Sequence, residues 1–189
     1  MRRAAEFVDK RMFIALSSGA NYDQVFNLWQ SLSLKRAEIT FICPWWVIPY
    51  KEAKIFLFSD PPTTPIAYVT CNKGFDNITN DEFDAIIVPD GLFSTNGVLR
   101  NDNQFIEILK NSKLVGLMGS GVDLLLPMEK IIKKTVIKVS EVESDLIFAG
   151  GIIGESNVEV IWNEANKIVL GKNLSDEFLG KVEELIKHI

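Results

Sequence analysis

A glycine-rich turn between two apolar segments is the part of the chain best placed for chemistry. Residues 113–126 read KLVGLMGSGVDLLL, the pattern of a buried strand that turns sharply through glycines into a helix. In α/β enzymes such a turn holds a nucleophile over the sheet, and the helix N-terminus stabilises an anion or a thiolate. Here the residue at the turn is Gly119, which adopts positive φ without steric cost but carries no reactive side chain. We therefore expect an enzyme-like turn without a nucleophile.

The turn offers backbone groups in place of a side chain. Gly119, Ser120 and Gly121 would present several N–H groups at a helix N-terminus, which suits a phosphate, sulfate or carboxylate. The alternative is that the glycines only let the strand and the helix pack closely, and Asp90 would offset the positive potential. Ser120 is not expected to act as a nucleophile, because the single histidine, His188, lies at the end of a different helix and no base is evident.

The two cysteines and the acidic residues give weaker signals. Cys43 is at the carboxyl end of a predicted parallel strand, where ligands gather in open α/β sheets, so it is a redox candidate. A small buried hydrophobe is the favoured interpretation, because Lys51 is the one basic residue nearby, and Cys71 has still less to recommend it. Scattered acidic residues have no spacing that makes them converge: Glu141, Glu143, Asp145 and Glu155. We expect no metal and no cofactor.

An aromatic and proline-rich stretch follows the first cysteine. Trp45 and Trp46 come directly after Cys43 and Pro44 and precede more apolar residues. Adjacent tryptophans in an irregular segment bury a large area at a subunit interface, line a ligand pocket or cap the core. The sequence leaves these three alternatives open.

Length and composition favour one domain that does not bind nucleic acid. The 189 residues are 47% hydrophobic, enough for a substantial core, and residues 1–11 are expected to be an N-terminal extension of a single domain spanning residues 1–189. The net charge of −5 argues against a protein that binds phosphate backbones through clustered Lys and Arg. No apolar run approaches the roughly 20 residues that cross a bilayer, and the N-terminus has no apolar secretory signal. We expect a cytoplasmic protein without membrane partners.

Strands and helices are expected to alternate through the first half of the chain. An apolar run at residues 12–17 predicts a strand. A helix is then indicated by residues at helical spacing: Val25, Phe26, Trp29 and Leu32. Residues 37–43 predict a second strand that stops at Pro44, which has no N–H for a ladder. Residues 55–58 and 66–71 flank a proline-rich turn and predict a peripheral pair of strands.

The second half continues the alternation. Residues 84–89 are almost continuously apolar, as in a parallel strand covered on both faces, and a helix precedes the strand that starts at Leu114. Further strands are expected at residues 135–139, 146–148, 158–162 and 167–170, the last two as a hairpin. Ser175 is expected to cap a final helix with one apolar stripe. The fold class is α/β: a doubly wound, flavodoxin-like, mostly parallel sheet sandwiched by helices, with a small antiparallel hairpin addition.

Two of these segments carry a resemblance to a known family. Residues 83–91, FDAIIVPDG, are similar to the "FDALVLPGG" segment of the PfpI/ThiJ family, within the class I glutamine amidotransferase-like superfamily. Residues 113–121, KLVGLMGSG, are similar to its "KPVATICHG" segment, and the separation and the helix between them match. The run from Ala149 to the terminal helix resembles the family's closing segment more weakly. The resemblance covers nearly the whole chain and implies a homo-oligomer, with a dimer as the first expectation.

The working residues of the family are replaced in this chain. The resemblance places the nucleophilic cysteine at Gly119 and the histidine after it at Ser120. The carboxylate that contacts the cysteine falls at Asn21, or at Asp23 if the alignment slips by two positions. The first glycine of the family's "PGG" turn, an oxyanion donor in active members, is Asp90. The chain is expected to be a degenerate member, because these groups work as a unit and a partial set is ineffective.

Three hypotheses follow. The first is a non-catalytic PfpI/ThiJ-like domain that acts through oligomeric assembly or through binding a small, anionic molecule. Its candidate ligand-binding residues are Gly119, Ser120, Gly121, Asp90, Gly91 and Asn21. The second is a hydrolase, glyoxalase or deglycase-type enzyme whose nucleophile or acid/base has moved. Its residual candidates are Asn21, Asp23, Asp90, Ser120 and Cys43. The third is an accessory assembly domain like the one at the C-terminus of large-subunit catalases.

Overall fold

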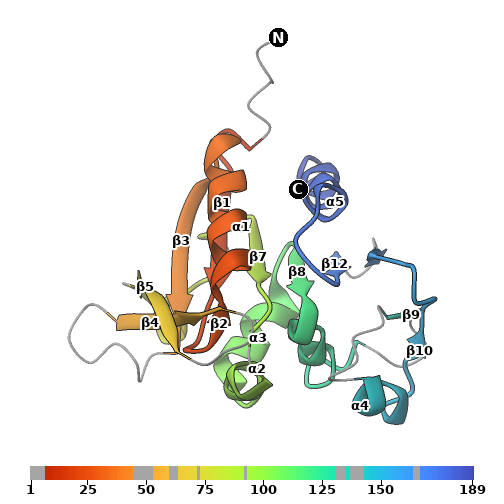
Figure 1. Cartoon of the computed structure of the whole chain (residues 1–189). Coiled ribbons are helices and arrows are strands. Elements are labelled where there is room, and N and C mark those ends of the chain that lie inside the picture. The colour runs from red at the N-terminus through yellow and green to blue at the C-terminus, as the bar shows by residue number, and fades with distance from the viewer. Residues whose placement is uncertain are drawn as a thin grey trace.

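A mostly parallel sheet forms the centre of the molecule. The computed structural model describes residues 7–44, 53–59, 64–71, 73–91, 93–130, 135–136, 143–163 and 167–189. Within these residues seven strands pair in the order β11-β12-β8-β7-β1-β3-β6 (Figure 1). Their bounds are β1 Arg11–Ala15, β3 Glu38–Cys43, β6 Lys73–Gly74, β7 Ala85–Val88, β8 Val115–Met118, β11 Val160–Asn163 and β12 Ile168–Gly171. Only the β11–β12 pair runs antiparallel, so the predicted sheet and its hairpin are confirmed.

Helices cover both faces of this sheet. Successive residues of a strand point to opposite faces. Met12 and Ile14 of β1 therefore pack in one apolar cluster with α1 (Tyr22–Leu34) and α5 (Asp176–Ile186). Phe13 and Ala15 pack in a second cluster with α3 (Asn103–Asn111) and the end of α2 (Phe93–Arg100). Burial on both faces explains why the central strands are almost continuously apolar in sequence.

Side-chain caps fix where three of the helices begin. Asn21, Asp102 and Ser175 precede α1, α3 and α5, and each side-chain oxygen accepts a hydrogen bond from a backbone N–H three residues further on. The cap predicted at Ser175 is confirmed. Phe178 of α5 packs so closely on the sheet that a Cβ added at Gly116 of β8 would lie 2.9 Å from its ring. A glycine in β8 thus allows the terminal helix to close one face.

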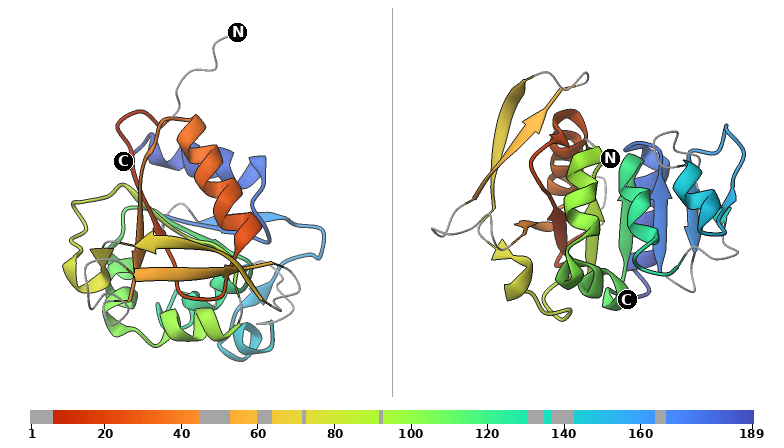
Figure 2. Two further views of the ribbon diagram at one scale, coloured as in Figure 1. Left: turned by 60° about the vertical axis from the view of Figure 1, so that its left-hand side comes forward. Right: turned by 90° about the horizontal axis from the view of Figure 1, so that it is seen from below.

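Two smaller sheets flank the central one on opposite sides (Figures 1 and 2). The first contains β2 (Ala20–Asn21), β4 (Ala53–Phe58) and β5 (Pro65–Cys71), where β2 runs parallel to β4 and β4 pairs antiparallel with β5. The predicted peripheral pair is therefore confirmed. The second contains β9 (Thr135–Val136) and β10 (Ile152–Ile153). A short 3₁₀ helix, η2 (Phe75–Asn77), follows β6.

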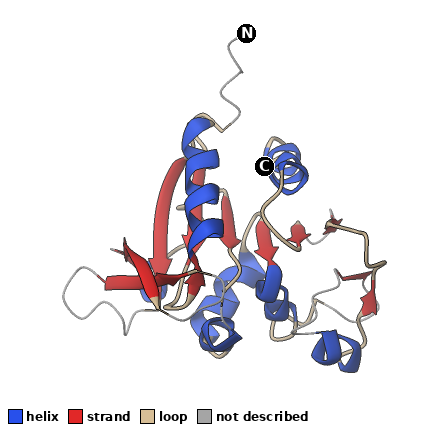
Figure 3. Cartoon of the chain, in the orientation of Figure 1, coloured by secondary structure: helices blue, strands red, loops and turns tan. Residues whose placement is uncertain are grey.

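The strand predicted at residues 146–148 is wrong. These residues belong to a helix, α4 (Glu143–Phe148), drawn in blue beside the β9–β10 pair in Figure 3. Gly150 has φ +87°, its N–H donates to Ile147 O, and the N–H of Gly151 donates to Leu146 O, which is the Schellman arrangement that ends a helix. Three apolar residues are too few to distinguish a helix from a strand by periodicity, whereas the two glycines were the informative signal.

Other segments differ from the sequence prediction in smaller ways. Helix α2 and strands β6 and β10 were not predicted. Strand β1 begins at Arg11, the last residue assigned to the extension, and Phe7 is fully buried, with its N–H donating to Lys35 O at 3.0 Å. Residues 137–139 of an expected strand lie outside the described residues, as do Trp45 and Trp46. Among the described helices, none has the length and apolar character needed to span a bilayer.

Candidate functional site

The glycine turn has the backbone geometry expected of an elbow. Strand β8 ends at Met118, and Gly119 follows with φ +53°, a left-handed conformation that glycine adopts without a Cβ clash. The chain then enters a 3₁₀ helix, η3 (Gly119–Leu125), whose residues are all buried. Strand β7 lies parallel beside β8, so Asp90, two residues past its end, reaches the same edge of the sheet. Asp90 and Gly119, which the sequence analysis assigned to one candidate site, therefore lie together.

The carboxylate of Asp90 occupies the turn. Its Oδ1 accepts a hydrogen bond from the backbone N–H of Ser120 at 2.9 Å, from the Ser120 hydroxyl at 2.8 Å and from its own neighbour, the N–H of Gly91, at 2.8 Å. Hydrogen bonds from amides to a carboxylate are charge-assisted and stronger than those between neutral groups. The donors that would hold an anionic ligand or an oxyanion therefore already bind an anion that belongs to the chain.

Gly119 and Asp90 also share space. A Cβ added at Gly119 would lie 2.3 Å from Asp90 Cγ and 2.4 Å from Oδ1, distances that no real side chain tolerates. The carboxylate thus fills the volume into which a nucleophile at position 119 would project. The Asp90 side chain occupies the space that a side chain at residue 119 would need. A side chain at residue 119 therefore requires a smaller residue than Asp at position 90.

Helix α1 holds Asp90 from the opposite side. Asn21, the cap of α1, donates its backbone N–H to Asp90 O at 2.9 Å. Gln24 accepts from the N–H of Asp90 through Oε1 at 3.2 Å and donates through Nε2 to Asn173 Oδ1 at 3.2 Å. The predicted Asn21 is therefore part of this arrangement, with its side chain engaged in capping. Gly121 packs against β7, where an added Cβ would lie 3.3 Å from Val88 O.

The arrangement brings one hydroxyl and one carboxylate into contact. Ser120 Oγ lies 2.8 Å from Asp90 Oδ1 and 2.9 Å from Gly91 O, and its single proton is donated to one of them at a time. A carboxylate in contact with a hydroxyl is the minimal pair for nucleophilic attack. However, Ser120 is buried, and the amides of Ser120 and Gly91 that would stabilise an oxyanion donate to Asp90 instead.

The remaining candidates lie elsewhere. Asp23 is exposed in the first turn of α1, and His188 is exposed after α5. Cys43 ends β3 and is fully buried in the same apolar cluster as the equally buried Cys71. Within the described part of the chain, no three acidic, histidine or cysteine side chains gather as a metal site would require. Glu141 and Lys51 fall outside the described residues.

A buried ion pair beside the elbow was missed. Asp123 of η3 is 1% exposed, and its Oδ2 accepts from Arg100 Nη1 of α2 at 2.7 Å. Arg100 also lies 3.5 Å from Asp145 of α4, while Asp123 Oδ1 has no hydrogen-bond partner in the described residues. Burial raises the pKa of Asp123, and Arg100 partly opposes that rise. The signal in the sequence was an aspartate inside the apolar run GVDLLL.

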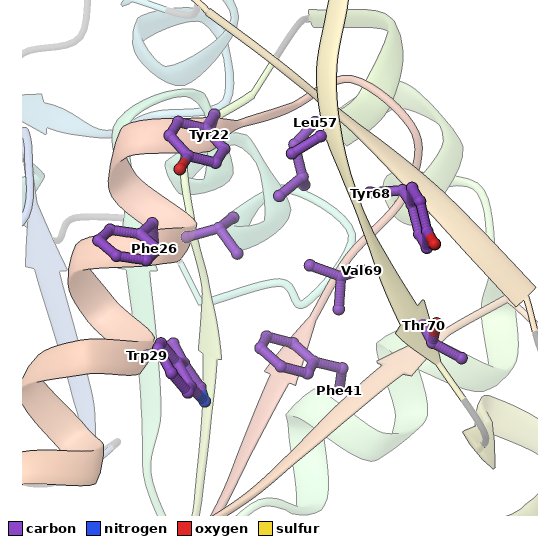
Figure 4. Close-up of a pocket in the computed structure, with 10 residues that line it drawn as sticks. Tyr22, Phe26, Trp29, Phe41, Leu57, Tyr68, Val69 and Thr70 are labelled. Atoms are coloured by element: carbon purple, nitrogen blue, oxygen red, sulfur yellow. The ribbon is translucent and has the colours of Figure 1, made fainter.

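An apolar groove between α1 and the β4–β5 hairpin was also missed. It has a volume of about 390 Å³ and is lined by Tyr22, Val25, Phe26, Trp29, Phe41, Leu57, Ala67, Tyr68, Val69 and Thr70. In Figure 4 the three aromatic rings of α1 form one wall, and Leu57, Val69 and Phe41 face them. Tyr22 stacks on Phe26 with ring centroids 5.8 Å apart. Phe26 and Trp29 nevertheless remain 41% and 42% exposed.

Comparisons with known proteins identify the fold. No family model matches the chain, and no curated protein matches its sequence. A ThiJ/PfpI domain protein from Brachyspira murdochii superposes with a TM-score of 0.75 at 15% identity, covering 97% of this chain and 99% of that one. Drosophila melanogaster DJ-1beta superposes with a TM-score of 0.70 at 12% identity, covering 95% and 94%.

A longer protein contains the same fold as one of its parts. A two-domain protein from Anabaena variabilis, with DJ-1/ThiJ/PfpI-like and ferritin-like domains, superposes with a TM-score of 0.73 at 12% identity. The match covers 95% of this chain but only 48% of the Anabaena protein. At such identities a shared fold does not carry chemistry with it. The chain therefore has the DJ-1/ThiJ/PfpI-type fold that the two sequence segments predicted.

Proposed function

We propose that this protein is a non-catalytic domain of the ThiJ/PfpI type that acts through assembly with a second copy of itself. One observation carries the proposal: the Asp90 carboxylate lies against Gly119 and accepts hydrogen bonds from the groups that would hold a substrate oxyanion. An external anion at the elbow would have to displace Asp90 and bring a second negative charge beside it. Assembly is therefore favoured over anion binding at the elbow.

The absence of elbow chemistry is tested with purified protein. Methylglyoxal, a generic ester and a peptide substrate cover the glyoxalase or deglycase and hydrolase alternatives. We expect turnover no faster than the buffer rate, and we expect Ser120→Ala and Cys43→Ala to behave like the wild type. Turnover that either substitution abolishes would refute the non-catalytic proposal.

The groove between α1 and the β4–β5 hairpin is the surface that we assign to assembly. Its rings present contiguous apolar area to water, and patches of this kind mark interaction surfaces when they are extensive. Tyr68 at its rim is 54% exposed and lies under Lys54 Nζ, 4.6 Å from the ring centroid. Aromatic side chains with one polar edge are enriched at protein interfaces. None of the described residues that line the groove is charged, so a second copy that covers them desolvates no ion apart from Lys54 at the rim.

Molecular mass in solution tests the assembly. Sedimentation equilibrium of the wild type is expected to give twice the chain mass at micromolar concentration, and Trp29→Glu is expected to give the monomer mass. Phe148→Glu is the matched control, because Phe148 is 96% exposed on α4, outside the groove lining. A monomeric wild type would refute the assembly proposal, and dissociation by both substitutions would refute its location.

A relocated serine nucleophile is the second candidate. The 2.8 Å contact between Ser120 Oγ and Asp90 Oδ1 favours it, because it joins a hydroxyl to a base. For Asp90 to act in this way, its carboxylate must give up the amides of Ser120 and Gly91 to the oxyanion. A burst of acyl-enzyme with an activated ester, lost in Ser120→Ala, would establish this candidate.

The accessory-domain alternative rests on the longer Anabaena protein, where a domain of this fold is joined to a ferritin-like domain. It predicts that the chain purifies from its natural source in a complex with another subunit. A native complex that contains only copies of this chain would favour self-assembly instead. The cytoplasmic location remains a prediction.

A further inference from the structure

The two cysteines of the chain meet where two sheets join. Cys43 is the last residue of β3 in the central sheet, and Cys71 is the last residue of β5 in the hairpin sheet. Two residues after Cys71, Lys73 of β6 pairs with Ile42, directly before Cys43. The crossing of the chain from one sheet to the other therefore brings Cys71 beside Cys43. Both side chains are fully buried in the same apolar cluster.

Strands β3 and β5 pack against each other, and the interaction between the two buried cysteines at their ends makes the two thiols unequal. The hydrogen bond from Cys71 stabilises the thiolate of Cys43 and lowers the pKa of Cys43, although burial opposes this effect. The pKa of Cys71 is raised by the same hydrogen bond, by burial and by the charge on Cys43. A thiol that ionises more readily beside one that keeps its proton is the arrangement of an attacking and a resolving cysteine.

We infer that Cys43 and Cys71 form an oxidisable dithiol whose co-reactant is hydrogen peroxide or another small hydroperoxide. Cys43 thiolate attacks one peroxide oxygen and breaks the O–O bond, which yields a sulfenic acid and, after protonation, water. Cys71 sulfur then displaces the sulfenic oxygen as a second water, and the Sγ–Sγ bond forms. In total, two thiols lose two protons and two electrons, and one peroxide becomes two waters.

Size selects the oxidant. Neither sulfur reaches the surface, so a bulky disulfide reagent is excluded while the hairpin is closed. Strand β5 is at the edge of its three-stranded sheet, and edge elements open locally at lower free energy than the core. Local opening admits a small peroxide. The resulting bond would close the chain from residue 43 to residue 71 and tie the β4–β5 hairpin to β3. This inference does not depend on the proposed function, because neither cysteine belongs to the elbow or to the groove lining.

Mass spectrometry of folded protein treated with hydrogen peroxide tests the inference. The wild type is expected to lose about 2 Da and to give a non-reduced peptide pair joining Cys43 to Cys71. In Cys71→Ser, Cys43 is expected to stop at the sulfenic acid, which dimedone labels when it is added with denaturant after the peroxide has been removed. In Cys43→Ser, Cys71 is expected to stay unmodified over the same time. The variants are compared only if their circular dichroism matches the wild type, and the wild-type mass decides the question without them.

Three results would overturn the inference. The first is a wild-type mass that does not change in the folded state. The second is a gain of about 16 Da or its multiples without a linked peptide. The third is a disulfide between two chains in place of the internal bond. A linked peptide that forms only in denaturant counts as the first of these.

Discussion

The elbow and the groove differ in whether residues of the chain itself already occupy them. At the elbow, the backbone N–H groups of Ser120 and Gly91 are bonded to Asp90, and the space above Gly119 is filled. At the groove, aromatic rings of α1 remain open to solvent with little polar area among them. The hydrogen bonds at the elbow stabilise the folded chain, whereas the exposed rings of the groove would stabilise only a complex with a second copy. Substitutions at the elbow should therefore lower the free energy of unfolding, and substitutions in the groove should weaken association.

The largest expected effect comes from placing a cysteine at the turn. Gly119→Cys must adopt positive φ and push into Asp90, which together cost about 2–5 kcal/mol of the free energy of unfolding. Urea denaturation measures this loss. In the double variant with Asp90→Gly the clash is relieved, so it should be less destabilised than the sum of the single variants by about 1–3 kcal/mol.

A matched glycine separates this effect from the general cost of adding a side chain. Gly180 lies in α5, where an added Cβ meets no atom within 4 Å. Gly180→Cys is expected to change stability by less than about 0.5 kcal/mol, because cysteine is a slightly better helix former than glycine. Equal losses at the two positions would show that Asp90 does not fill the elbow.

Removing the internal anion is the next largest effect. Asp90→Ala leaves the amides of Ser120 and Gly91 without their acceptor and is expected to cost about 1–3 kcal/mol. Added sulfate should then stabilise Asp90→Ala more than it stabilises the wild type. Asp90→Asn keeps an acceptor oxygen, so it should lose less stability and respond to sulfate as the wild type does. A wild type that gains as much from sulfate as Asp90→Ala would mean that the site is open.

The incompletely bonded carboxylate beside the elbow predicts a pH effect. The folded-state pKa of Asp123 is raised above its ordinary value. Between these two pKa values the unfolded chain has released a proton that the folded chain still binds, so stability falls as the pH rises, by at most about 1.4 kcal/mol per pH unit. Asp123→Asn removes this slope, and unfolding midpoints measured across the acid range would reveal it. Parallel pH profiles for the two proteins would contradict the raised pKa.

Local sequence patterns predicted most of the fold, because strands of a parallel sheet that is buried on both faces are continuous apolar runs. Residues 85–89 and 114–118 are apolar without alternation, and Ser175 marks the start of the last helix. The strand expected at residues 146–148 failed, because only Leu146 of that run is buried while Ile147 and Phe148 face solvent. A run of three apolar residues does not show which of the side chains will be buried.

The sequence predicted which residues meet at the candidate site, but it did not predict that the Asp90 carboxylate is bonded to the backbone of the turn. The family-like segments indicated that Asp90 and Gly119 would meet, and the charge of Asp90 suggested repulsion of a ligand. That its carboxylate turns inward and binds the elbow amides depends on side-chain direction, which spacing does not determine. The Arg100–Asp123 pair and the groove join elements distant in sequence, so they require the tertiary structure.

The smallest expected effect on stability lies at the groove. Phe26 and Leu28 are two residues apart on α1, but Phe26 is half-exposed in the groove while Leu28 is fully buried under the helix. Leu28→Ala should therefore cost about 2–5 kcal/mol, and Phe26→Ala less than about 0.5 kcal/mol, in the isolated monomer. If a second copy covers the groove, Phe26→Ala should instead weaken the concentration dependence of the thermal midpoint, because association stabilises only the folded state. A large loss of monomer stability in Phe26→Ala would show that the ring serves the core, and the contrast between the two regions would fail.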